Sequence, residues 1–232
     1  MKKHIPNFLT LLNLFCGLVA LQYAFIAEFK WALFWIFLGI VFDFFDGFVA
    51  RLLKVSSPLG LQLDSLADMV TSGVVPGQVM FYLIQNTTPS HNGIYNYLPF
   101  LGFLITLASG YRLAKFNIDT RQTSSFIGLP TPANALFIVS IGVCQQDENY
   151  TFILLPLWLL ILITVISCYL LNSNIELFAL KFKDFSLKNN AIKYFFLLIS
   201  IILLLIFKIL GIPIIIVAYI LLSILMKITK KL

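Results

Sequence analysis

Residues 31–68 read WALFWIFLGIVFDFFDGFVARLLKVSSPLGLQLDSLAD, an apolar run that then acquires acids, glycines and an arginine. The first acids and small residues recur at i, i+3, i+4 and i+7, so they share one face of a helix. They are Asp43, Asp46, Gly47 and Ala50. After a break at 56–58, a second helix carries Gly60, Asp64 and Asp68 at i, i+4 and i+8. The segment therefore predicts two helices whose acidic faces oppose each other as an antiparallel pair.

The composition of the whole chain places these helices in a bilayer. Of its 232 residues, 60% are hydrophobic and 11% are charged, whereas soluble domains contain about 25% charged residues. A hydrocarbon core about 30 Å thick needs about 20 apolar residues per helical span, so the chain has room for about eight spans. This composition leaves no room for a soluble domain.

Apolar runs between charged or turn-rich breaks predict an all-α membrane protein with eight transmembrane helices. The expected spans are 8–27, 31–53, 59–84, 97–115, 132–146, 151–171, 190–209 and 212–228. The first run exceeds the roughly 7–15 residues of a signal-peptide core, so we expect it to be retained as a helix. We expect one domain over 1–232, with a catalytic core of about 1–175 and lipid-facing helices over about 190–228, because intramembrane charges mark functional helices.

The basic residues predict how the chain is oriented. All but two of the 16 lysines and arginines fall on one side of the predicted spans, and the exceptions are Lys30 and Lys208. Basic residues collect in cytoplasmic loops, so both termini and the acidic cluster are expected at the cytoplasmic edge of the membrane, which we expect to be a bacterial inner membrane. The net charge of +6 is thus a topology signal and gives no support for nucleic-acid binding.

Four aspartates near one edge of a bilayer predict a bound cation. Their mutual repulsion and loss of hydration cost several kcal/mol each, and Arg51 is the only basic residue beside them on the two faces. Oxygen ligands of this kind suit Mg²⁺ or Mn²⁺ better than zinc or copper. The alternative for the acids is a proton or ion relay in a transporter.

The small residues on the same faces suggest close approach of a ligand. Gly47, Ala50 and Gly60 leave room for phosphate groups against the helix backbone. Their alternative explanation is ordinary small-residue packing between membrane helices.

The complete pattern resembles the signature of the CDP-alcohol phosphotransferases. It runs Asp43-x-x-Asp46-Gly47-x-x-Ala50-Arg51, then eight residues, then Gly60-x-x-x-Asp64-x-x-x-Asp68. Eight fixed identities, each met about one time in twenty, match by chance on the order of 10⁻¹⁰ per starting point.

A closer resemblance, over most of the first 135 residues, is to the phosphatidylserine synthases of this family. It rests on three stretches of sequence: IPNFLTLLN at 5–13, LDSLAD at 63–68 and FIGLPTPA at 126–133.

The resemblance implies transfer of the phosphatidyl group of CDP-diacylglycerol to the hydroxyl of L-serine, with release of CMP. It also implies two Mg²⁺ or Mn²⁺ ions. The implied metal ligands are Asp43, Asp46, Asp64 and Asp68, with Asp68 also the proton acceptor. The implied contacts to CDP-diacylglycerol are Asn7, Thr10, Gly47, Ala50, Arg51, Ser57 and Gly60. For Asn7 and Thr10 the alternative is helix capping beside Pro6.

A basic loop on the same predicted side is the candidate acceptor site. It carries Arg112, Lys115, Asn117 and Arg121. A guanidinium binds a carboxylate with two charge-assisted hydrogen bonds, although the positive-inside rule alone also accounts for these residues.

Two other readings of the function stay open at this point. Glycerol 3-phosphate or an inositol phosphate is the alternative acceptor, and an ion-coupled transporter, which often shows two related halves, is the alternative class. The expected partners are CDP-diacylglycerol, L-serine, the bilayer and a second copy of the chain in a homodimer, without nucleic acid.

Overall fold

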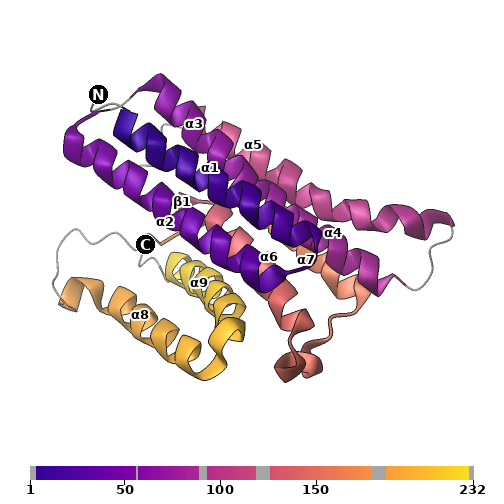
Figure 1. Ribbon diagram of the computed structural model, residues 1–232. Coiled ribbons are helices and arrows are strands. Elements are labelled where there is room, and N and C mark those ends of the chain that lie inside the picture. The colour runs from indigo at the N-terminus through magenta and orange to yellow at the C-terminus, as the bar shows by residue number, and fades with distance from the viewer. Residues whose placement is uncertain (1–3, 56, 89–92, 119–125, 179–186, 230–232) are drawn as a thin grey trace.

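The computed structural model describes residues 4–55, 57–88, 93–118, 126–178 and 187–229, and these are almost entirely helical (Figure 1). The α-helices are α1 (His4–Phe25), α2 (Phe29–Leu53), α3 (Pro58–Asp68), α4 (Val75–Thr87), α5 (Leu104–Ile118), α6 (Thr131–Gln146), α7 (Leu157–Asn172), α8 (Leu187–Phe207) and α9 (Gly211–Ile228). Other helical turns are η1 (Met69–Val74), η2 (Gly93–Phe103), η3 (Glu148–Ile153) and η4 (Lys208–Leu210). Two-residue strands β1 (Phe126–Ile127) and β2 (Glu176–Leu177) pair antiparallel.

A helix lies in each of the eight predicted ranges. Among the described residues, four helical segments are long and apolar enough to cross a membrane, namely His4–Phe25, Phe29–Leu53, Tyr95–Ile118 and Asn190–Ile228. The last segment contains the turn η4 and folds back on itself as the pair α8–α9 (Figure 1). The prediction of an all-α, multi-pass integral membrane protein is confirmed at this level.

The third predicted span is one continuous rod made of α3, η1 and α4. Its middle part, Met69–Val74, is a π-helix. Pro76 lies in the first turn of α4 and has no N–H to offer the preceding turn, which disfavours regular α-helical bonding there. The Thr106 hydroxyl of the neighbouring segment donates to the Gly73 carbonyl at 3.0 Å, so one carbonyl of the widened turn has a partner.

The hydrophobic core lies where α1, α2, α4 and α6 meet. Phe29, Ile36, Ile84 and Ile138 are completely buried there. Fully buried alanines of α1 and α2, such as Ala24, accompany them. Small residues of this kind let membrane helices approach closely, so the core holds α1 and α2 in fixed register below the acidic segment.

The predicted pairing of the two acidic helices is only partly correct. α1 packs along both α2 and α3, whereas α2 and α3 have little direct backbone contact. The acidic faces do oppose each other, but α1 joins the two helices and a cavity lies between them.

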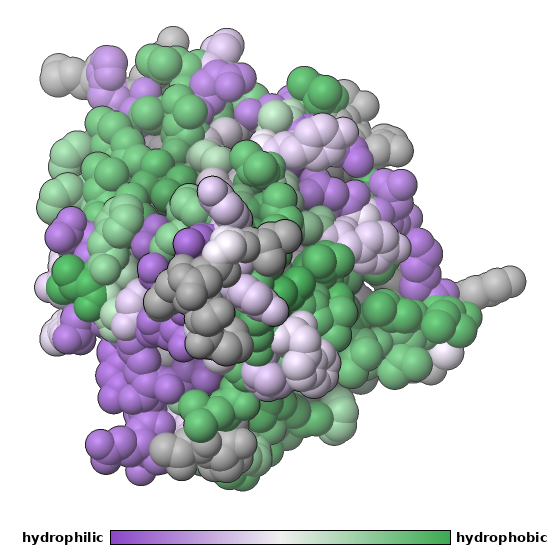
Figure 2. Space-filling model, turned by 90° about the vertical axis from the view of Figure 1, so that its right-hand side faces the viewer, coloured by the Kyte–Doolittle hydropathy of each residue, from purple (hydrophilic) through white to green (hydrophobic). Residues whose placement is uncertain are grey.

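The outer surface is strongly apolar, as a bilayer requires. Large exposed side chains include Phe8 and Phe15 of α1, Phe34 and Phe37 of α2, and Leu205 of α8. Figure 2 shows broad hydrophobic areas on one face of the molecule, with hydrophilic residues gathered in separate patches. Exposed apolar area of this extent is typical of a surface that contacts lipid.

The start of α2 is tied to the end of α6 at the opposite end from the acids. Lys30 and Asp147 form an ion pair of 3.1 Å there. The backbone N–H of Asn149 donates to Asp147, and together with Lys30 it lowers the pKa of that carboxyl below its usual range. Lys30 was one of the two basic residues that the positive-inside rule left on this side, and the structure gives it a partner.

Candidate active site

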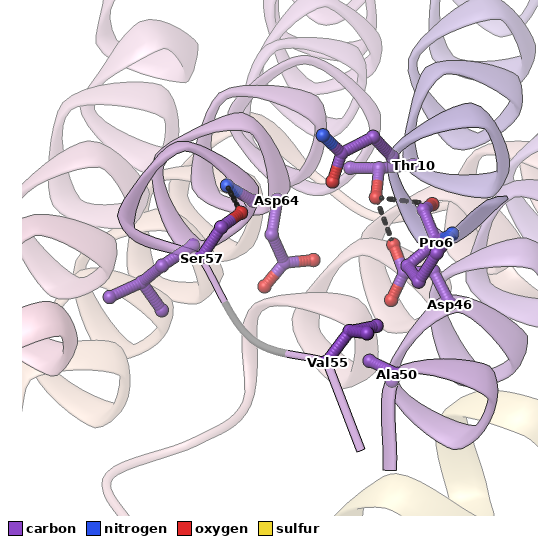
Figure 3. A pocket seen from close by; sticks show the side chains of 11 residues that line it. Pro6, Thr10, Asp46, Ala50, Val55, Ser57 and Asp64 are labelled. Atoms are coloured by element: carbon purple, nitrogen blue, oxygen red, sulfur yellow. Dashed lines mark hydrogen bonds between the residues drawn. The ribbon is translucent and has the colours of Figure 1, made fainter. Parts of the chain in front are cut away.

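Three aspartates from two helices converge at the centre of the site. Asp43 and Asp46 of α2 and Asp64 of α3 each offer a carboxylate oxygen, and these oxygens lie within 4.8 Å of one another. In Figure 3 the side chains of Asp46 and Asp64 point into the space between their helices. Asp64 Oδ1 is buried and has no hydrogen-bond partner among the described residues. A buried carboxylate oxygen needs a partner, so the donor set fits a bound divalent cation.

Asp68 lies one turn beyond Asp64 and stands outside this group of three. Its Oδ1 accepts a hydrogen bond of 3.1 Å from Asn13 Nδ2 of α1. Arg112 of α5 is buried, with 9% of its surface exposed, and its positive charge acts on Asp68. Asp68 therefore has polar partners in Asn13 and Arg112.

A cavity of about 220 Å³ adjoins the acids. It is enclosed by the start of α1, the end of α2 and the start of α3, as Figure 3 shows. Its lining includes six of the seven predicted CDP-diacylglycerol contacts, namely Asn7, Thr10, Gly47, Ala50, Ser57 and Gly60. The seventh, Arg51, lies beside it, since a Cβ added at Gly47 would lie 3.4 Å from an Arg51 Nη1.

The start of α3 is well suited to face an anion. Ser57 caps the helix, because its Oγ accepts a hydrogen bond of 3.0 Å from the Gly60 N–H, and Pro58 occupies the first turn. Ser57 and Gly60 both line the cavity. The positive end of the α3 dipole therefore lies at the cavity, where it favours negative charge.

Thr10, which was predicted to contact CDP-diacylglycerol, also forms a hydrogen bond to one of the aspartates. Its hydroxyl is buried and lies 2.5 Å from Asp46 Oδ2 and 3.1 Å from the Pro6 carbonyl (Figure 3). Its single proton can serve only one of these acceptors at a time. Thr10 thus lines the cavity and also orients Asp46.

The residues of the predicted acceptor loop are placed differently. Arg112 is next to the acids and lines a small polar cavity with Lys115 and Asn172. Asn117 Nδ2 donates to Ser65 Oγ at 2.8 Å, which links α5 to α3 one residue from Asp64. Arg121 lies outside the described residues.

Sequence reasoning missed two buried polar residues of the site, Asn13 and Thr71. Asn13 follows Thr10 by three residues and so shares its helical face. A polar residue on that face of an otherwise apolar helix was the available signal. Thr71 had no such signal, because it lies in the π-helix, where α-helical spacing does not apply.

The fold and the site define a class: an all-α integral membrane protein with several spans that gathers acids and a cavity at one end of its early helices. The sequence model of the CDP-alcohol phosphatidyltransferase family matches residues 3–169. The chain belongs to this family, and it is a transferase.

Curated relatives match about three fifths of the chain. The CDP-diacylglycerol–serine O-phosphatidyltransferase of Bacillus subtilis (strain 168) is 36% identical over 144 residues, which cover 60% of this chain and 76% of the relative. The protein of the same name from Methanocaldococcus jannaschii is 36% identical over 146 residues, covering 63% of each chain. That from Saccharomyces cerevisiae (strain S288c) is 32% identical over 163 residues, covering 62% of this chain and 55% of the relative.

Proposed function

We propose that the protein transfers the phosphatidyl group of CDP-diacylglycerol to the hydroxyl of L-serine, forming phosphatidylserine and CMP. The observation that carries this proposal is the cavity, which is lined by Asp46, Asp64, the start of α3 and six predicted CDP-diacylglycerol contacts, with the Asp43 carboxylate beside the other two acids. The relatives in three organisms that bear the name of this activity support the choice of serine.

The cavity residues hold the nucleotide end of the donor. Gly47 and Gly60 leave the backbones of α2 and α3 open to the phosphates. Arg51 supplies positive charge beside Gly47, and Ser57 presents the start of α3. Ala50, Asn7 and Thr10 complete the contacts on the sides of the cavity.

Asp43, Asp46, Asp64 and Asp68 would hold two divalent cations, Mg²⁺ or Mn²⁺. When bound, the ions supply positive charge that stabilises the phosphates and the leaving CMP. The buried Asp64 Oδ1, which has no hydrogen-bond partner in the described part of the chain, supports this assignment.

The reaction itself needs a base and an acceptor site. The serine oxygen forms a bond to the phosphorus that carries the diacylglycerol, the bond from that phosphorus to the CMP oxygen breaks, and Asp68 takes the hydroxyl proton. Asp68 is suited to act as this general base because it lies outside the group of three aspartates, and its carboxylate can accept a proton from a hydroxyl held within hydrogen-bond distance. Arg112 binds the serine carboxylate, for which a planar guanidinium is well shaped.

The membrane arrangement belongs to the same proposal. Eight helices cross the bilayer, with both termini and the acids on the cytoplasmic side of a bacterial inner membrane. Residues 1–175 form the catalytic core and 190–228 the lipid-facing addition. The protein acts as a homodimer, which native mass measurement in detergent tests directly.

One experiment tests the activity. Purified protein is incubated with CDP-diacylglycerol, Mg²⁺ or Mn²⁺ and, separately, serine, glycerol 3-phosphate, inositol phosphate or no alcohol, and the lipid product is identified. Phosphatidylserine as the main product is the expected result. A phosphorylated product contradicts the acceptor, and no lipid product in any arm contradicts the proposed reaction and favours the transporter class.

A further inference from the structure

A buried chain of hydrogen bonds leads from the π-helix to Asp68. Thr71 Oγ1 lies 2.9 Å from Asn13 Oδ1 and 3.2 Å from the Asn13 carbonyl. Asn13 Nδ2 then donates to Asp68 Oδ1 at 3.1 Å. Thr71 and Asn13 are both 0% exposed, so water does not compete for these bonds.

The chain of bonds orients the Asn13 amide. The carboxylate of Asp68 accepts and does not donate when ionised, so it requires the amide nitrogen of Asn13 on its side. Of the two acceptors within reach of the Thr71 hydroxyl, Asn13 Oδ1 is the nearer at 2.9 Å, and a hydrogen bond to it keeps the amide oxygen on the opposite side. Reversing the amide would place its oxygen against the carboxylate and leave buried groups without partners, which is costly.

Close helix packing holds these residues in place. A Cβ added at Gly39 of α2 would lie 2.9 Å from Asn13 Oδ1 and 2.9 Å from Thr71 Cγ2. A Cβ added at Gly17 of α1 would lie 3.0 Å from the Thr71 backbone. Both glycines therefore let the helix backbones close on the pair, and the π-helix presents Thr71 to α1 at this point.

We propose that Asn13 and Thr71 are positioning residues for Asp68, holding its Oδ1 so that Oδ2 is the oxygen that receives the acceptor's proton. This inference rests on the proposed function and assigns to it two residues outside the family signature. Neither residue contacts the substrates; both act through Asp68.

A pair of variants at Thr71 isolates the hydroxyl. Thr71→Val keeps the branched shape without the hydroxyl, and Thr71→Ser keeps the hydroxyl without the methyl group. We expect Thr71→Val to lower kcat by about 5- to 10-fold, because an oriented hydrogen bond is lost, and Thr71→Ser to stay within about 3-fold of the wild type. KM for CDP-diacylglycerol should change by less than about 3-fold in both, since the cavity is untouched.

Removing the amide tests the direct contact. Asn13→Leu has a similar shape and cannot donate to Asp68, so kcat should fall by about 10- to 100-fold, the range for losing a hydrogen bond to a charged group. The matched control is Thr164→Val in α7, a buried threonine whose hydroxyl bonds the Leu160 carbonyl at 2.9 Å. It should leave kcat unchanged. Nucleotide binding and thermal unfolding, measured directly for each variant, show whether the protein is folded and loaded.

The outcomes separate the inference from the function on which it rests. Normal kcat in Thr71→Val and Asn13→Leu, or equal losses in Thr71→Val and Thr71→Ser, overturns the positioning role while the activity stands. A rise in KM without a fall in kcat also overturns it. If the wild type prefers another alcohol, only the assignment of serine as acceptor falls. The kcat series is then measured with that alcohol, because Asp68 would have to accept its hydroxyl proton in the same way.

Discussion

An alanine at Gly47 separates folding from donor binding. Gly47 lies in the last part of α2 and lines the cavity. Beyond the adjoining residues and backbone of its own helix, an added Cβ would meet one atom of the described residues within 4 Å, Arg51 Nη1, at the ordinary contact distance of 3.4 Å. Since alanine in a helix interior is about 0.5–1 kcal/mol more favourable than glycine, we expect the free energy of unfolding of Gly47→Ala to be equal to or slightly above that of the wild type.

The same methyl group enters space that we assign to the phosphates of CDP-diacylglycerol. If one phosphate oxygen is pushed out of reach of a donor, one charge-assisted hydrogen bond is lost, at a cost of about 1.5–3 kcal/mol. With a tenfold change for each 1.36 kcal/mol, KM for CDP-diacylglycerol should rise by about 10- to 100-fold. KM for serine should change much less, because Arg112 lines a different cavity from Gly47.

The measurement is the initial rate of CMP release in mixed micelles at varied CDP-diacylglycerol, together with thermal unfolding of the same preparations. Gly39→Ala on the same helix is the matched control, because its Cβ would lie 2.9 Å from Asn13 Oδ1 and should lower the unfolding temperature. A stable Gly47→Ala protein with a normal KM for CDP-diacylglycerol would refute the placement of the phosphates.

Four further predictions address the metal, the base, the acceptor and the topology. Excess chelator should abolish turnover and added Mg²⁺ or Mn²⁺ restore it; full activity in chelator contradicts the metal site. Asp68→Asn should lose almost all turnover yet still bind CDP-diacylglycerol, and wild-type turnover would exclude it as the base. Arg112→Ala should raise KM for serine by about 10- to 100-fold and Arg112→Lys should restore it only in part, because the fork is lost; a normal serine KM contradicts the assignment. In a cysteine-free background, an impermeant thiol reagent applied outside intact cells should label a cysteine at Glu148 and not one at Asn174, and the reverse pattern would invert the topology.

The positions of the helices were predictable because a bilayer leaves few alternatives. Backbone groups in lipid must bond within a helix, so apolar run lengths alone located α2 (Phe29–Leu53) within two residues of the predicted 31–53. The π-helix at Met69–Val74 was not predictable in this way. It depends on Pro76 together with a hydroxyl supplied by Thr106, a residue 30 positions further along the chain.

In the site, too, local spacing predicted some contacts, and others depend on how distant helices pack. The approach of Asp43, Asp46 and Asp64 followed from spacing on two helices, and the structure brings them together. The contact between Asn13 and Asp68 spans 55 positions and depends on how α1 packs against α3, which no local pattern encodes. The burial of Arg112 beside Asp68 has the same origin, since positive-inside counting treats all basic residues of a loop alike.

The widened turn at Met69–Val74 also sets the rotational phase between the two halves of the rod. An α-helix advances about 100° per residue, so one extra residue accommodated in a π turn rotates everything after it by about that angle. The buried face of α4 carries Val75 and Val79. The angle about the rod axis between this face and the acids of α3 therefore differs from the angle that an uninterrupted α-helix would give. A deletion of one residue in this turn would leave every signature residue in the chain and still turn the core face of α4 out of the bundle. In a protein with this fold, a one-residue alignment gap at Met69–Val74 would therefore mean a rotated α4, even where all eight signature residues are present.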